Sequence, residues 1–330
     1  MHFAAIDHPV TMDTLNAATG GDTVEADPDS VVDAFEQSTL SIKSPVSVQV
    51  QETWRRPSSR SAPSDEGVEL YFEIPFARVI SPAAAVDGGS ASSGKKYVIY
   101  DVSVLKNSAN HDPNPTIVER RYTHFLKLFN GLKKDNAQLV QNVMFPKKVL
   151  IGNFSGELIG ERSQAFESFL DYIVSVPLLR DSEHFLEFLQ GEELSKACQL
   201  LDERRNEFAV PILENTFRIL NKIFLDKSKC VLLLLCRLVA ACTTSPIPHP
   251  LAEQWAELAL RRYEHVCDTE LLVLYIPLLH TCLHLWWQRG RDRSLLEERL
   301  DQMGKKGIKI KGGPTLAKAI HALDPRAETT

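Results

Sequence analysis

Three β-prone segments open the ordered part of the hydrophobic pattern. Residues 68–80, 96–105 and 116–122 are rich in β-branched and aromatic side chains, and much of their length alternates between apolar and polar positions. Turn-forming stretches separate the three segments. Pro75 predicts a bulge or an edge position in the first segment because proline has no N–H for a β-ladder. The pattern therefore predicts a three-stranded antiparallel meander.

Helical spacing begins directly after the third segment. Thr123 is a suitable N-cap, and apolar residues recur behind it at Phe125, Leu128, Phe129 and Leu132. A second helix is predicted from about Ser155 to Val176 and a short third helix over 182–189, with Pro177 ending the second. Meander and helices together predict an α+β domain.

Beyond Gly191 the spacing is helical throughout. Leucine-rich segments of similar length, separated by breaks near Pro211, Ser245 to Pro250 and Gly290, predict antiparallel helix pairs of a tetratricopeptide-like kind. No repeat signature aligns clearly between them. The predicted helices cover residues 193–208, 210–226, 228–243, 250–266, 269–288 and 293–303.

The head of the chain differs in composition from the rest. Residues 1–66 are rich in Asp, Ser, Thr and Pro without a sustained period, which predicts disorder. Residues 1–67 carry 11 acids against 4 bases, residues 68–192 carry 15 against 13, and residues 193–330 carry 17 against 20. An acidic head and a nearly neutral body argue against a protein that binds nucleic acid over a basic surface.

The positions of the cysteines and the lengths of the apolar runs indicate the cellular compartment in which the protein is expected. All six cysteines lie in the C-terminal half within leucine-rich patterns and form no C-x-x-C pair, so we expect reduced core residues in a cytoplasmic protein. The run from Cys230 to Cys242 is too short to span a bilayer and predicts a buried helix. The first residues lack a secretory pattern. We therefore expect any membrane association to be peripheral.

The most informative chemistry lies where the third predicted strand meets a helix. Arg121 offers a guanidinium fork suited to a phosphate, and the ring of Tyr122 can pack on a sugar-like ring. Arg120 is expected to point away from that pocket and to matter much less for binding. Arg162 interrupts the apolar stripe of the second helix, so it requires a buried partner or an anion. An arginine pair before a tyrosine is, by itself, more often a surface strand end.

A lysine pair, Lys147 and Lys148, follows an apolar loop. Three apolar residues of that loop, Val143, Met144 and Phe145, are candidates for membrane insertion, and the lysines would add attraction to an anionic surface.

From Val68 to about Gln190 these features resemble a PX (phox-homology) domain. The matching motifs are Arg120–Phe125, the apolar-Pro-Lys-Lys loop at 145–148 and Glu161–Arg162. With the helices behind them they are similar to sorting nexins of the PX-PXB type, the sorting nexin-20 and sorting nexin-21 subfamily. The resemblance implies a disordered region over 1–66, a PX domain over 67–191 and a helical PXB protein-interaction domain over 192–325.

The resemblance also implies a ligand, phosphatidylinositol 3-phosphate, and a role for each site residue. Arg121 matches the arginine on the 3-phosphate, and Tyr122 matches the ring that packs on inositol. Lys148 matches the lysine that reaches the 1-phosphate, and Arg162 matches the arginine on the 4- and 5-hydroxyls. The chain departs from the family pattern in two places: the proline-rich loop is reduced to Pro146, and His124 replaces a common acidic residue.

The function implied is a non-enzymatic adaptor. It would sit on the early endosome membrane as a peripheral protein and recruit protein cargo or a receptor tail through its helical domain, without a cofactor. The alternative is a protein-interaction scaffold with weak or different phosphoinositide specificity, in which Tyr263, Trp286 and Trp287 line a groove; core packing is the simpler explanation of these rings. His280 and His284 lie one helical turn apart, but their context makes a metal site improbable.

Overall fold

A computed structural model describes residues 49–55, 69–81, 95–107, 116–149, 151–226, 228–244, 247–264, 266 and 269–324. Its sheet contains four strands in the order β1-β2-β3-β4, each antiparallel to its neighbour. Their bounds are Gln49–Arg55 (β1), Glu69–Ser81 (β2), Tyr97–Asn107 (β3) and Thr116–Arg121 (β4).

The predicted meander is confirmed as β2, β3 and β4. Strand β1 lies inside the region expected to be disordered, and its backbone pairs with β2. Residues 1–66 show no sustained period and β1 is short, so its pairing could not be predicted from local pattern. The rest of residues 1–66 lies outside the described residues, as does the hairpin loop predicted over 81–94 apart from Ser81, which ends β2.

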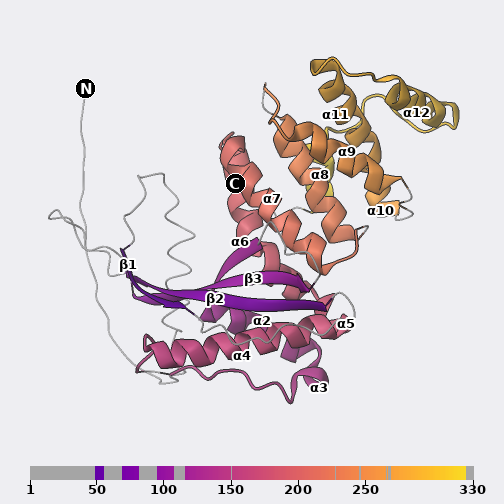
Figure 1. Ribbon diagram of the computed structural model, residues 1–330. Coiled ribbons are helices and arrows are strands. Elements are labelled where there is room, and N and C mark those ends of the chain that lie inside the picture. Colours follow the sequence, from indigo (N-terminus) through magenta and orange to yellow (C-terminus); the bar gives the residue numbers. More distant parts are fainter. Residues whose placement is uncertain are drawn as a thin grey trace, which may run out of the picture. The chain divides into compact units, whose positions relative to one another are not determined.

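A bulge in β2 helps to fix helix α4 (Gly156–Ser175) against the sheet. The register of β2 on β3 shifts between Glu73 and Phe76, around Pro75, as the sequence predicts. The backbone N–H of Ile74 donates to Glu167 Oε1 at 2.7 Å on α4. Because a buried amide without a partner is costly, this contact stabilises the bulge and aligns the helix that carries Arg162. Figure 1 shows α4 running along one face of the sheet.

The other helices that precede residue 182 are α2 (Tyr122–Asp135), α3 (Ala137–Val140) and α5 (Pro177–Arg180). Helix α2 begins at Tyr122, directly at the end of β4, with Arg121 at the N-cap position; the prediction of Thr123 as N-cap is wrong, because Thr123 lies inside the first turn. Helix α4 begins where the sequence predicts it, and the Ser155 side chain caps it by accepting a hydrogen bond from the N–H of Leu158. Helix α3 was not predicted.

Helix α6 (Glu183–Asp202) is continuous, whereas the sequence predicts one helix over 182–189 and another over 193–208. The expected domain boundary at 191/192 therefore falls within a helix. Gly191 lies inside α6 and does not interrupt it, because one glycine costs only about 1 kcal/mol in a helix and packing on both sides of it compensates.

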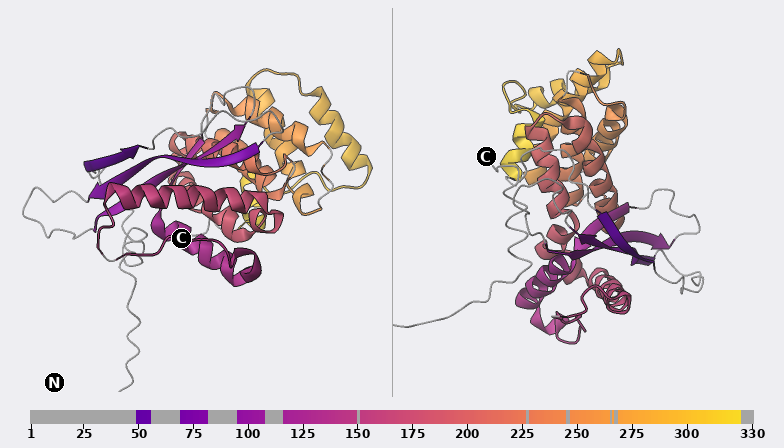
Figure 2. Two further views of the ribbon diagram at one scale, coloured as in Figure 1. Left: turned by 60° about the horizontal axis from the view of Figure 1, so that its bottom comes forward. Right: turned by 90° about the vertical axis from the view of Figure 1, so that its left-hand side faces the viewer.

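The C-terminal part is helical, as predicted, and neighbouring helices pack on one another along the chain from α6 to α9. Figure 2 shows this region from two further sides. Pro211 lies within α7 rather than at a break. Helix α13 was not predicted, because its eight residues follow a basic, glycine-containing stretch. The helices are α7 (Asn206–Ile223), α8 (Lys229–Thr243), α9 (Ala252–Tyr263), α10 (Thr269–Leu272), α11 (Tyr275–Gln288), α12 (Ser294–Lys305) and α13 (Leu316–Leu323).

Two apolar stretches of this region are core helices. Helix α8, the predicted buried helix, has nearly all of its residues from Val231 to Cys242 buried. The stretch Glu270–Gln288 is long and apolar enough to cross a membrane by composition, with mean hydropathy 1.2. It is interrupted between α10 and α11, and α11 packs on α8, α9, α12 and α13. We therefore interpret it as part of the helical core.

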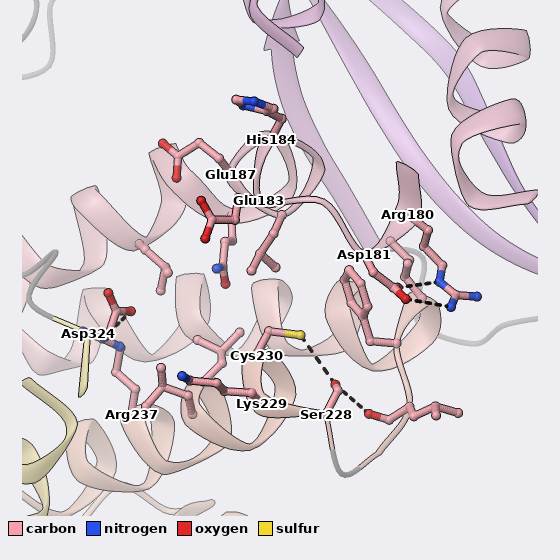
Figure 3. A pocket seen from close by; sticks show the side chains of 18 of the residues that line it. Arg180, Asp181, Glu183, His184, Glu187, Ser228, Lys229, Cys230, Arg237 and Asp324 are labelled. Atoms are coloured by element: carbon pink, nitrogen blue, oxygen red, sulfur yellow. Dashed lines mark hydrogen bonds and ion pairs between the residues drawn. The ribbon is translucent and has the colours of Figure 1, made fainter. Parts of the chain in front are cut away.

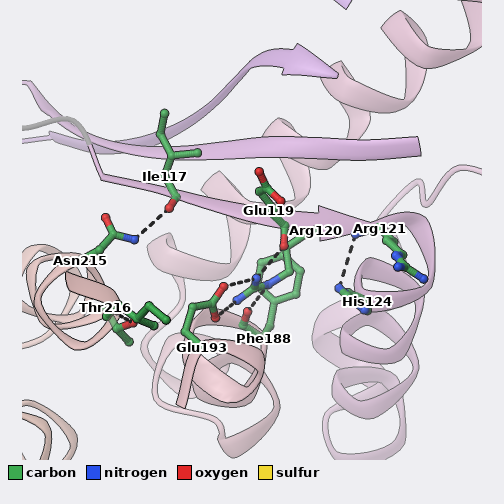
Figure 4. A network of polar contacts seen from close by, with 10 residues as sticks. Ile117, Glu119, Arg120, Arg121, His124, Phe188, Glu193, Asn215 and Thr216 are labelled. Carbon is green, nitrogen blue, oxygen red and sulfur yellow. Dashed lines mark hydrogen bonds and ion pairs between the residues drawn. The ribbon is translucent and has the colours of Figure 1, made fainter. Parts of the chain in front are cut away.

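One buried arginine joins the sheet to the helical part. Arg120 on β4 is 1% exposed, and its guanidinium forms a two-pronged ion pair with Glu193 on α6, at 2.7 Å for each oxygen. Its Nε donates to the carbonyl oxygen of Phe188 at 2.6 Å. Figure 4 shows the Arg120 side chain extending from β4 toward Phe188 and Glu193. The expectation that Arg120 points away from the pocket is confirmed, and the reason is a structural role.

Two side chains of helix α7 add three polar contacts to the same sheet edge. Lys222 Nζ donates to the carbonyl oxygen of Val104 at 3.1 Å and to Thr116 Oγ1 at 3.0 Å. Asn215 Nδ2 donates to the carbonyl oxygen of Ile117 at 2.9 Å. The exposed edge of β4 is thereby covered, which removes a template for strand pairing with another chain.

Replacement of Arg120 by alanine is predicted to lower the free energy of unfolding by about 3–5 kcal/mol, because it leaves the Glu193 carboxylate without its cation in a mostly buried place. Urea denaturation of the full chain measures this. Arg180→Ala is the control: it removes an exposed pair with Asp181, and its cost is expected to stay below about 1 kcal/mol. Equal effects of the two substitutions would contradict the role assigned to Arg120.

Candidate phosphoinositide site

Arg162, which interrupts the apolar stripe of α4, has a buried guanidinium. Arg162 is 3% exposed, and its Cζ lies 4.5 Å from the centre of the Tyr122 ring, a cation–π contact. Its terminal nitrogen donates to Asn153 Oδ1 at 3.1 Å and to the carbonyl oxygen of Lys147 at 3.4 Å. Its Nε has no hydrogen-bond partner among the described residues. These contacts are neutral, so the positive charge of Arg162 is left for an anion or a polar ligand to compensate.

Tyr122 links this guanidinium to the lysine loop. Its hydroxyl donates to the carbonyl oxygen of Pro146 at 2.8 Å, and its ring lies 6.0 Å from that of Phe145 and 6.1 Å from that of Phe166. The side chain is buried, with 8% exposed. Tyr122 therefore supports Arg162 and holds the loop, and the area that it leaves for direct packing on an inositol ring is small.

Arg121 lies at the junction of β4 and α2, on the side of the strand away from Arg120. Its Cζ lies 3.8 Å from the centre of the Tyr97 ring on β3. Arg121 pairs with Ile99 in the β3–β4 register, and Tyr97 is the diagonal neighbour on the same face of the sheet. The stacked ring fixes the orientation of the guanidinium plane.

A second tyrosine, Tyr100, lies in the interior next to this site. Its pKa is raised to about 12, mainly by burial, and the nearby charge of Arg162 opposes the rise. Tyr100 therefore stays neutral at physiological pH and does not compensate the charge of Arg162.

Of the four predicted site residues, the structure brings Tyr122 and Arg162 into contact with each other and with backbone oxygens of the lysine loop, while the Lys148 side chain is exposed. Arg121 directly precedes Tyr122 in the chain. Sequence reasoning missed Tyr97 and Asn153. The alternation of β3 marks Tyr97 as a strand residue, but its place under Arg121 depends on the strand register, which local pattern does not set.

The predicted insertion residues separate into two groups. Met144 is 91% exposed, whereas Phe145 is partly buried in the cluster of aromatic rings, 4.6 Å from the Phe129 ring. Val143 also packs on the core. Ile151, which sequence reasoning missed, is 91% exposed just beyond the lysine pair. Of the described apolar residues from 143 to 151, Met144 and Ile151 are the ones that can enter a lipid surface in this conformation.

A cavity of about 910 Å³ lies between α6 and the α7–α8 region, away from the lysine loop. Its lining mixes apolar and charged side chains, and the ion pairs Arg180–Asp181 and Arg237–Asp324 lie in it, as Figure 3 shows. Burial raises the pKa of the Cys230 thiol. A protonated thiol is a poor nucleophile, so this cavity shows no constellation typical of covalent catalysis.

The two histidines considered for metal binding have other contacts. His280 Nε2 lies 3.1 Å from the carbonyl oxygen of Ile310, and the ring of His284 stacks with that of Trp287. No group of three metal-ligating side chains occurs in the described part of the chain. The five described cysteines are free thiols; Cys267 lies outside the described residues.

Comparison with known proteins identifies the family. The PX domain family model matches residues 108–192. Sorting nexin-20 of Bos taurus is 30% identical over 71% of this chain and 70% of its own length, and sorting nexin-20 of Rattus norvegicus is 30% identical over 77% and 75%. The chain belongs to the sorting nexin family.

Two further matches are a second sorting nexin and a solved PX domain. Human sorting nexin-21 is 26% identical to this sorting nexin over 82% of the chain and 68% of its own length. The crystal structure of the mouse SNX19 PX domain with bound sulphate ion is 25% identical and covers 37% of this chain and 97% of that one, with a TM-score of 0.28. The resemblance to the sorting nexin-20 and sorting nexin-21 subfamily, drawn from the arginine and lysine motifs, is confirmed, as is the PX fold followed by helices.

The histidine beside the arginine pair is predicted to make this sorting nexin less stable in mild acid. Burial, then the charges of Arg120 and Arg121, lowers the pKa of His124 from 6.5 to about 4. Its Nδ1 accepts a hydrogen bond from the N–H of Arg121 at 3.4 Å, which requires the neutral ring. The unfolded chain binds a proton at higher pH, so stability falls as the pH drops from above 6.5 toward 4, by about 2 kcal/mol between pH 7 and pH 5.

Denaturation at both pH values, with His124→Gln alongside, measures this contribution. The variant is expected to lose that part of the pH dependence. An identical difference between pH 7 and pH 5 in the two proteins would contradict the assignment.

Proposed function

We propose that this sorting nexin is a peripheral membrane adaptor that binds phosphatidylinositol 3-phosphate on early endosomes through its PX domain. It recruits protein partners or cargo through the helical region that follows. The observation that carries the lipid part is the buried Arg162, held over Tyr122 by neutral contacts next to the lysine loop. Its relatives are sorting nexins, which supports membrane trafficking as the setting.

The site supplies cations at three positions around one ring-sized ligand. Arg121 is assigned to the 3-phosphate, Lys148 to the 1-phosphate and Arg162 to the hydroxyls at positions 4 and 5. Tyr122 orients Arg162 and lines the pocket. A guanidinium binds phosphate through two parallel hydrogen bonds, so Arg121 contributes the most to affinity among these groups.

Headgroup binding alone gives modest membrane affinity, so a second contact is needed. Met144 and Ile151 flank the lysine pair in sequence and are almost fully exposed. Insertion of these two side chains, with Lys147 and Lys148 attracted to anionic lipid at about 1 kcal/mol each, completes the membrane contact.

The alternative function is a protein-interaction scaffold with weak or different phosphoinositide specificity. The limited exposure of Tyr122 favours a pocket that differs from the one the family motif implies. A panel of liposomes, each with one phosphoinositide, separates the two functions: a preference for phosphatidylinositol 3-phosphate supports the first, and equal weak binding to all supports the second.

Arg121→Ala is predicted to weaken binding to liposomes that contain phosphatidylinositol 3-phosphate by about 10- to 100-fold, because a charge-assisted contact to phosphate contributes about 1.5–3 kcal/mol. Co-sedimentation of the full chain measures this. Lys134→Ala, at the far end of α2, removes an exposed positive charge and serves as the control. Undiminished binding by Arg121→Ala would overturn the pocket assignment.

Met144→Asp with Ile151→Asp is predicted to weaken liposome binding by at least about tenfold while leaving affinity for soluble inositol 1,3-bisphosphate unchanged, because charged side chains oppose burial in the membrane surface. Leu178→Asp, 70% exposed on α5, is the matched control and should leave both affinities intact. Loss of affinity for the soluble headgroup as well would indicate that the double substitution disturbs the pocket rather than insertion.

A further inference from the structure

A groove of about 1,000 Å³ lies in the helical region, between α11, the end of α8 and the segment 309–317. It is at the upper end of the usual size range of ligand sites, about 300–1,000 Å³. The groove shares no lining residue with the predicted lipid site, all of whose members come from β4, α2, α4 and the 143–148 loop. It is therefore a separate surface.

The lysines that line the groove give it a positive charge. Lys309 and Lys311 lie in its wall, and no aspartate or glutamate occurs among the described residues that line it. The sequence around this wall is also basic: from Gln302 to Leu323 there is no acid, and the lysines are Lys305, Lys306, Lys309, Lys311 and Lys318. In a protein of net charge −6, such a stretch attracts an acidic partner.

The groove also offers apolar contacts. Val273, Ile276, Leu285 and Ile310 contribute to its lining, and Val273 is 54% exposed. Trp287, one residue from the lining residue Gln288, is 61% exposed and stacks on the ring of His284 with centroids 5.7 Å apart. An exposed tryptophan beside a lined groove is typical of protein-binding surfaces.

The segment that carries Lys309 and Lys311, called the basic wall below, is attached to α11. His280 Nε2 donates to the carbonyl oxygen of Ile310 at 3.1 Å, which joins the wall to α11 between the two lysines. Gly312 and Gly313 follow, and no atom lies within 4 Å of the position where a Cβ would be, so open space borders the backbone there. An extended peptide can approach such a backbone closely.

We propose that this groove binds an acidic, extended peptide segment of a partner protein that also carries an apolar side chain. The carboxylates pair with Lys309 and Lys311, and the apolar side chain packs against the α11 face that includes Val273 and Ile276. A concave site fits a peptide better than a bilayer, because a flat lipid surface does not reach the lining of a hollow. The inference specifies the partner chemistry for the proposed recruiting role of the helical region and does not depend on the lipid pocket.

The test selects peptides on the full-length protein from a random peptide display library. Each selected peptide is synthesised with a fluorescent label, together with a copy in which every Asp and Glu becomes Asn and Gln. We expect the selected peptides to be enriched in acidic residues with at least one apolar residue. By fluorescence anisotropy, the neutral copies and the Lys309→Glu/Lys311→Glu protein should each show affinity weaker by at least about tenfold.

Lys306→Glu/Lys318→Glu is the matched control. It makes the same change in charge within the same basic stretch at residues that do not line the groove, and it should leave peptide affinity within about threefold of the unsubstituted protein. Equal loss in the control and the groove variant, or selected peptides whose neutral copies bind equally well, would overturn the proposal.

A second experiment tests whether the groove binds anionic lipid instead of an acidic peptide. Vesicles of phosphatidylcholine and phosphatidylserine without phosphoinositide are offered to Arg121→Ala proteins with and without the groove substitutions. Loss of vesicle binding on groove substitution, without selection of acidic peptides, would show a membrane contact and overturn the proposal. Arg121→Ala should retain peptide binding, so failure of the lipid function and failure of the peptide site give different results.

Discussion

The ion pair between Arg120 and Glu193 connects the two functional parts of the chain. It joins the last residues of the sheet to a helix that continues into the C-terminal region, and Arg120 is 1% exposed. A buried charge without its partner is strongly destabilising, so this end of β4 and this part of α6 must stay together. The PX part and the helices behind it consequently share one junction rather than a flexible linker.

The same junction determines what the neighbouring residues can do. Successive side chains on a strand point to opposite faces, so burial of Arg120 leaves Arg121 directed to the other side, over Tyr97. Phe188, whose carbonyl accepts from Arg120, contacts Phe125, which stacks on Phe166 with centroids 3.8 Å apart. This ring cluster extends to Tyr122 and holds Arg162 in place.

Local patterns predicted the parts of the fold that depend on near neighbours: the bulge at Pro75, the three strands of the meander, and the burial of Arg162 on an apolar stripe. Other features depend on distant partners and could not be predicted. Arg120 is buried because Glu193 lies across the junction, and Phe145 is held in the core by rings from α2 and α4, although its neighbours in sequence suggested insertion. Gly191 signalled a break that packing on α2 and α7 prevents.

The most direct test of the account is a crystal structure of this protein with a soluble short-chain phosphatidylinositol 3-phosphate. The account predicts the 3-phosphate at the Arg121 guanidinium, the inositol hydroxyls toward Arg162 and the 1-phosphate near Lys148, with the Arg120–Glu193 pair intact. A headgroup bound elsewhere on the surface, or a 3-phosphate that contacts Arg120 after the pair has opened, would contradict the division of roles between the two arginines.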